Sequence, residues 1–184
     1  MKRSSALLRL VFPGILLCLT VISCQKFEEY PDEPYIEFRE FGLIVNPQTG
    51  ISEKGILRIF YRDGDGDIGL EQGDTLFPFQ EDGDYYYNLL ITYYEQQNGV
   101  FTEVPLVSWN NITQQYDTLT FNARMPLLLP KDQKKSIKGI IDNEMFIYNP
   151  LSAYDTIQFR VKITDRALNV SNEVVTPPIV LIKP

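Results

Sequence analysis

Apolar and polar residues alternate strictly from Ile157 to Thr164, a pattern that predicts a half-buried β-strand. Other stretches are dense in aromatic and β-branched residues, which also favour strands. These further strands are expected near residues 55–61, 85–94, 100–109, 118–123, 136–147 and 174–182. No segment shows a sustained helical period of apolar residues, so the pattern predicts an all-β fold.

Turn signals separate the expected strands. Asn98-Gly99 predicts a tight hairpin turn, because both residues tolerate a positive φ. Pro177-Pro178 predicts an edge strand or a broken one, because proline cannot donate to a sheet. Seven to nine short strands with turns between them indicate an Ig-like or fibronectin-III-like antiparallel β-sandwich over residues 35–184.

The first residues have the order of an export signal. Lys2, Arg3 and Arg9 precede an apolar run over residues 10–22. This run is short for a membrane span, so residues 1–23 are expected to be a signal peptide. Val21-Ile22-Ser23-Cys24 resembles the bacterial lipobox, a resemblance that implies cleavage before Cys24 and lipidation of that residue. A retained anchor helix, or an ordinary signal peptide with a chance cysteine, is the alternative.

The amino-acid composition limits the partners, catalytic mechanisms and metal ligands that are possible. The 184-residue chain has a formal net charge of −7, and without the three basic residues of 1–23 the remainder carries 14 Lys and Arg against 24 acids, a net of −10. This balance argues against nucleic acid as a partner. The absence of histidine excludes Ser-His and Cys-His mechanisms and His-ligated metals. No thiol pair remains after Cys24, so the sequence predicts no disulfide. The only clustered acids, near Asp63, have no neighbouring nucleophile or base, so the sequence also predicts no enzyme.

Residues 24–34 are expected to form an acidic tether. Gln25-Lys26-Phe27-Glu28-Glu29, with a Lys before two acids, resembles the surface-export signal of Bacteroidota lipoproteins. A solvated linker with a charge run is the alternative. Pro31 and Pro34 favour an extended chain.

The stretch with the clearest chemistry is Asp63-Gly64-Asp65-Gly66-Asp67-Ile68-Gly69. Alternating carboxylates with intervening glycines suit Ca²⁺, which prefers flexible oxygen ligands. The spacing resembles the EF-hand loop, which implies Asp63, Asp65, Asp67 and the Gly69 carbonyl as ligands. Ile68 in place of glycine, Asp74 in place of glutamate, and flanking strands argue against a true EF-hand. A Ca²⁺ loop of another kind and an acidic connection that only caps turns both stay open.

The expected strand topology brings further residues near this candidate metal site. In an Ig-like sandwich the connection at Asp63 and the turn from Asp165 to Asn169 lie at the same end, and the first strand, near Tyr35, begins there too. Asp165 or Asn169 could therefore complete the metal site, with hairpin-turn chemistry as the alternative for both. The tether would then enter beside the loop, where a bound ion could brace it.

Three Asp-Thr-aliphatic triplets resemble the O-glycosylation site of exported Bacteroidota proteins, which implies modification at Thr75, Thr118 and Thr156. The alternative is that threonine and an aliphatic residue simply begin strands after an Asp turn.

Taken together, the lipobox, the acidic tether, the Asp63–Leu70 motif and the run from Asp165 to Ser171 look like a group of Bacteroidota outer-membrane lipoproteins with an Ig-like domain. The resemblance implies a lipid-anchored, surface-exposed interaction or accessory module that binds a protein or glycan partner. It implies no known activity. The alternative is a carbohydrate-binding accessory lipoprotein of a glycan-uptake system. In that case Trp109 and the tyrosine clusters at 85–87 and 93–94 would supply stacking faces. Core and cross-strand packing is the alternative for these rings, because aromatic residues are common in sheets.

Overall fold

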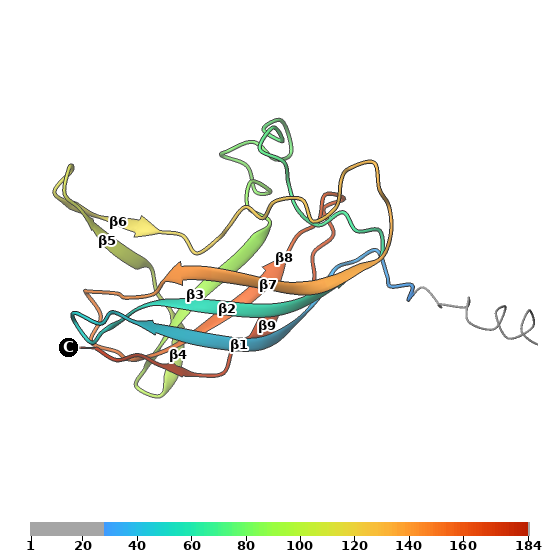
Figure 1. The fold of residues 1–184 in the computed structure, drawn as a ribbon. Coiled ribbons are helices and arrows are strands. Elements are labelled where there is room, and N and C mark those ends of the chain that lie inside the picture. The colour runs from blue at the N-terminus through green and yellow to red at the C-terminus, as the bar shows by residue number, and fades with distance from the viewer. Residues whose placement is uncertain (1–27, 184) are drawn as a thin grey trace, which may run out of the picture.

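The computed structural model describes residues 28–183 and has the all-β architecture that the alternation predicts (Figure 1). Its strands are β1 (Tyr35–Val45), β2 (Ser52–Asp63), β3 (Leu89–Gln97), β4 (Val100–Glu103), β5 (Leu106–Asn110), β6 (Gln115–Leu119), β7 (Ile137–Phe146), β8 (Thr156–Ile163), β9 (Val174–Val175) and β10 (Ile179–Val180). One sheet has the order β1-β2-β7 and a second the order β10-β8-β3-β4, with β9 also pairing with β8. All these pairs are antiparallel.

The two larger sheets pack face to face as a sandwich around a single core. Leu57 and Ile59 of β2 meet Phe159 and Val161 of β8, and all four are at most 1% exposed. Phe159 lies at the centre of an aromatic group whose ring-centroid distances from it are 5.2–5.7 Å. Its partners are Phe41, Tyr93 and Phe121.

The pairing of β1 with β2 brings the start of the domain beside the acidic loop. Tyr35 pairs with Arg62, the residue before Asp63, so β1 begins at the end of the sandwich where β2 finishes. Figure 1 shows residues 28–34, in blue, leaving from this same end. The expectation that the tether enters beside Asp63 is therefore confirmed.

The strand predictions needed three corrections. Tyr85, Tyr86 and Tyr87 precede β3 and lie in the long connection from β2. The expected strand over 100–109 is two strands, because Pro105 interrupts it and redirects the chain into a projecting β5–β6 hairpin (Figure 1). The segment near 118–123 belongs to β6 only as far as Leu119.

Candidate metal centre

The loop after β2 is fixed to the core by its apolar residues. Ile68 is fully buried and Leu70 is 4% exposed. The amide of Leu70 donates to the Met125 carbonyl at 2.9 Å, and the amide of Leu128 donates to the Ile68 carbonyl at 3.3 Å. Ile68, which occupies the position of the EF-hand glycine, is thus a core anchor for the loop.

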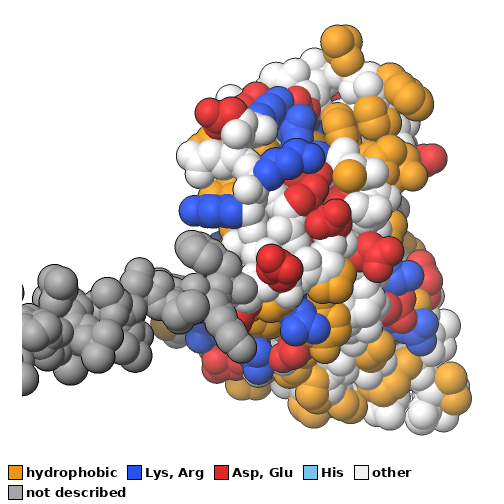
Figure 2. Space-filling view, turned by 90° about the vertical axis from the view of Figure 1, so that its right-hand side faces the viewer, with side chains coloured by type: hydrophobic (Ala, Val, Ile, Leu, Met, Phe, Trp, Pro, Cys, Tyr) orange, Lys and Arg blue, Asp and Glu red, His pale blue; other side chains and the backbone are white. Residues whose placement is uncertain are grey.

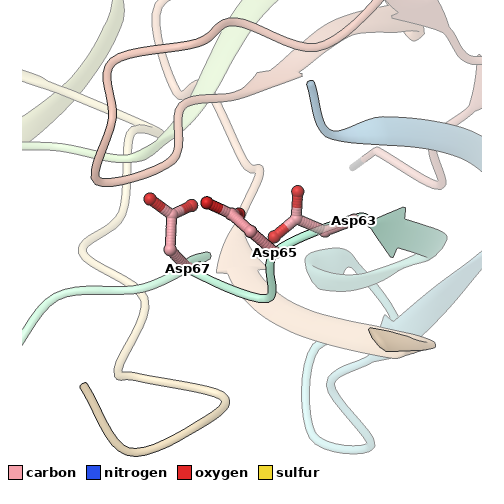
Figure 3. A group of neighbouring side chains, drawn as sticks. All are labelled: Asp63, Asp65 and Asp67. Atoms are coloured by element: carbon pink, nitrogen blue, oxygen red, sulfur yellow. The ribbon is translucent and has the colours of Figure 1, made fainter. Parts of the chain in front are cut away.

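This anchoring gathers three carboxylates. One oxygen each from Asp63, Asp65 and Asp67 lies within 4.8 Å of the others, and Figure 3 shows the three side chains side by side. The group could hold a metal ion. Figure 2 views the end of the sandwich that carries this loop, and acidic side chains gather across the middle of that face.

Several oxygens in this group have no hydrogen-bond donor among the described residues. Asp63 is 0% exposed, and neither of its carboxylate oxygens has a partner. Oδ1 of Asp65 and Oδ1 of Asp67 are also buried without one. A buried carboxylate normally accepts hydrogen bonds or meets a cation, because desolvation otherwise penalises its charge.

Burial and mutual repulsion disfavour ionisation here. Burial, followed by the charges of Asp65, Asp67 and Asp165, raises the pKa of Asp63 to about 7, although the nearby backbone amide of Asp67 acts in the opposite direction. Burial, followed by the charges of Asp165 and Asp65, raises the pKa of Asp67 to about 6. A divalent cation would offset both effects, since it supplies the missing opposite charge.

The turn from Asp165 to Asn169 lies directly on this loop. The amide of Ala167 donates to Oδ2 of Asp67 at 3.0 Å, and the amide of Arg166 donates to the Asp67 carbonyl at 3.3 Å. Both carboxylate oxygens of Asp165 accept bonds from Asn169, one from its amide at 2.8 Å and one from its side chain at 2.9 Å. The two loops thus meet as the topology predicts, and Asp165 and Asn169 also show the turn chemistry given as their alternative.

The remaining EF-hand positions differ from that motif. Asp74 pairs with Lys131 at 2.7 Å and with Arg166 at 2.6 Å. Gly69 packs against the backbone at Pro126 and Leu127. An EF-hand needs two helices, and the described part of the chain contains none.

Sequence reasoning missed a third segment at this site. The Ser136 hydroxyl donates to the Gly64 carbonyl at 3.0 Å, and the Lys135 amide donates to the Asp65 carbonyl at 3.2 Å. These two bonds fix the backbone carbonyls of the glycine-rich loop. No motif marks residues 135–136, because irregular segments leave no periodic signal.

The other predicted sites lie elsewhere. Thr75 and Thr118 are exposed, whereas Thr156 is partly buried at the start of β8 and donates to Asp155. Cys24 and the predicted signal peptide lie outside the described residues. No helix within 28–183 is long and apolar enough to span a membrane.

Comparisons with protein-family models, curated proteins and solved structures return no match.

Proposed function

We propose that this protein is a Ca²⁺-stabilised interaction module, not an enzyme, that Cys24 anchors by lipid at the outer surface of the outer membrane. The observation that carries the metal proposal is Asp63, which is fully buried beside two other carboxylates and has no side-chain donor to either oxygen within residues 28–183. A cation is the simplest partner for such a group.

Calcium suits the donor set better than other common ions. The chain has no histidine, and the ligands available in this loop are carboxylate and carbonyl oxygens. Zn²⁺ and Cu²⁺ favour nitrogen and sulfur, and Mg²⁺ retains much of its water shell. Three carboxylates from one glycine-rich loop offer Ca²⁺ several direct oxygen ligands at once.

The strand order supports an Ig-like domain. Sheets ordered β1-β2-β7 and β10-β8-β3-β4 correspond to the A-B-E and G-F-C-C′ arrangement of that fold. Such sandwiches expose loops and edges to partners and host many unrelated functions, so the fold supports an interaction role without specifying the partner.

The metal proposal is tested by thermal unfolding of the purified chain in millimolar Ca²⁺ and in chelator. At 100 times the dissociation constant, binding adds about 2.7 kcal/mol, which raises the melting temperature by several degrees. Asp65→Asn should abolish the shift, whereas Asp82→Asn, an exposed acid in another turn, should retain it. An unchanged melting temperature in wild-type protein would contradict calcium binding.

The anchor is tested separately by fractionating cells that produce wild-type protein or Cys24→Ala. Loss of one lipidated residue should move the protein out of the membrane fraction, because several acyl chains on that residue supply the attachment. Tight membrane attachment of Cys24→Ala would contradict lipidation.

A glycan-binding role is the second candidate, and one pair of residues favours it. Trp109 and Tyr116 pair across the β5–β6 hairpin with ring centroids 5.1 Å apart, and they are 48% and 45% exposed. A groove of about 530 Å³ adjoins this hairpin. Its polar lining residues are Thr92, Glu103, Thr118, Thr120 and Asn122. Neither ring lines the groove, but exposed aromatic faces on the same hairpin as hydroxyl-lined space suit sugars.

Glycan arrays and calorimetry with any resulting ligand test this candidate. Trp109→Ala should then abolish binding while leaving the melting temperature within about a degree, since the residue is half exposed. Phe77→Ala, which removes an exposed aromatic ring from the connection between β2 and β3, is the matched control. Glycan binding that survives Trp109→Ala would show that the binding site lies outside the hairpin.

A further inference from the structure

The tether rests directly on the metal loop. A Cβ atom added to Gly64 would lie 2.3 Å from the Tyr30 carbonyl oxygen and 2.5 Å from the Pro31 carbonyl oxygen. Only glycine permits so close an approach of two backbones. Gly64 stands between Asp63 and Asp65, so the tether touches the backbone that positions two of the three carboxylates.

A second contact lies one residue earlier. The guanidinium of Arg62 is 4.3 Å from the centroid of the Tyr35 ring and 5.5 Å from that of Tyr30. Arg62 thus joins the tether to the first residue of β1 through cation–π contacts. Lys138, at the start of β7, forms an ion pair with Glu28.

These contacts do not pack the whole tether against the domain. A cavity of about 240 Å³ separates part of the tether from the domain. Its lining includes Tyr30, Pro31, Tyr35 and Arg62. A segment held by few contacts opens more readily than the core, so a modest change in the loop can decide whether it stays docked.

We infer that metal binding between Asp63 and Asp67 holds tether residues 28–34 against the domain, and that loss of the metal releases them. This inference rests on the proposed metal site. Without a cation, three clustered carboxylates repel one another, and the backbone at Gly64 shifts as they separate. The docked tether requires that backbone in place, so the metal binds the docked state better than the released one.

Release would change how the domain stands on a membrane. Four residue steps separate Cys24 from Glu28, which reach about 13–14 Å when fully extended. A docked tether would therefore keep the acidic end near the lipid that Cys24 carries. A released tether of ten residues, 25–34, reaches about 33–36 Å and lets the domain reorient.

Limited proteolysis of the full chain in membrane vesicles tests this coupling. A Glu-specific protease cuts after Glu28 or Glu29, and mass spectrometry follows the truncated product in millimolar Ca²⁺ and in chelator. A reference peptide checks that the protease itself works equally in both buffers. Cleavage of wild-type protein should be about tenfold slower with Ca²⁺, because cutting requires the tether to open.

Three variants separate the steps. Gly64→Ala should be cut rapidly in both buffers and should bind Ca²⁺ more weakly than wild type by calorimetry, because the added methyl displaces the tether while the three carboxylates remain. Asp65→Asn should lose Ca²⁺ binding and be cut at the same rate in both buffers, because the ion no longer has its three carboxylates. Gly73→Ala, whose Cβ meets nothing within 4 Å, should behave as wild type. If Gly64→Ala does not fold, Arg62→Gln replaces it.

Two outcomes overturn the inference in different ways. If wild-type protein binds Ca²⁺ but is cut equally fast in both buffers, the coupling is wrong and the metal site stands. If it binds no Ca²⁺, both proposals fail.

Discussion

Asp63 and Glu95 are buried carboxylates at opposite ends of the sandwich, and among the residues that the structure describes only Glu95 has side-chain donors. Tyr93, Asn149 and Ser152 donate to Glu95 at 2.9, 3.1 and 2.6 Å, whereas neither oxygen of Asp63 has a partner. The same fold therefore satisfies one buried acid with its own side chains and leaves the other open. This contrast is the strongest reason to place a cation at Asp63.

Removing the Glu95 carboxylate should destabilise the domain strongly. Glu95→Ala leaves three donors unpaired in a site where the residue is 2% exposed, and it should cost about 3 kcal/mol of unfolding free energy. Glu95→Gln should cost less, because one acceptor oxygen remains. Urea unfolding measures both, with exposed Glu103→Ala expected within about 0.5 kcal/mol of wild type. A mild effect of Glu95→Ala would show that the three donors find other partners.

Asp74 should make stability depend on acidity. Burial raises its pKa, but hydrogen bonds from Lys131, the Glu71 amide and Arg166 outweigh burial and lower the pKa to about 2. Its folded pKa is below the ordinary value of 3.8, so its stabilising contribution is present above about pH 4 and is lost as pH falls toward 2. Asp74→Asn should cost about 2 kcal/mol at pH 7 in chelator and progressively less near pH 3. A difference that stays constant over this range would contradict the assignment.

Turn residues and the alternation of apolar and polar residues predicted the turns and strands that depend on neighbouring residues in the sequence. Asn98 and Gly99 have φ values of 52° and 83°, as a tight turn after β3 requires. Alternation placed β8, and antiparallel topology placed Asp63 near the turn at Asp165. Leu168 has a φ of 69° where glycine is usual, so the turn keeps its left-handed geometry despite a side chain.

Long-range contacts of irregular segments were not predictable in this way. The aromatic run at Tyr85 to Tyr87 has strand composition, but β3 begins only at Leu89, which pairs with Ile163, the last residue of β8. The contacts of Lys135 and Ser136 with the acidic loop join residues about 70 positions apart. No repeat or motif marks them, because their partners are backbone carbonyls that any residue could supply.

Gly69 should be indispensable where Gly73 is not. Gly69 has a φ of 107°, and a Cβ there would lie 2.2 Å from the Pro126 carbonyl oxygen. Gly69→Ala should therefore lose about 3 kcal/mol or more of unfolding free energy, from backbone strain and steric overlap together. Gly73→Ala, in the same connection, should be neutral or slightly stabilising, since it only restricts the unfolded chain. Equal effects in urea unfolding would mean that the loop rearranges freely around Gly69.

Asp63→Asn should reverse its effect on stability when Ca²⁺ is present. In chelator at pH 8, wild-type Asp63 is forced to carry charge in a buried site beside other acids, and the neutral amide should be about 1–2 kcal/mol more stable. In millimolar Ca²⁺ the wild-type protein should be the more stable one, because the ion binds the Asp63 carboxylate more strongly than the amide that replaces it. Urea unfolding of both proteins in both buffers gives the four free energies, and Asp82→Asn serves as a charge-matched control without a predicted reversal. Asp63→Asn that is less stable than wild type even in chelator would mean that the buried carboxylate makes a stabilising contact of its own and does not need a cation.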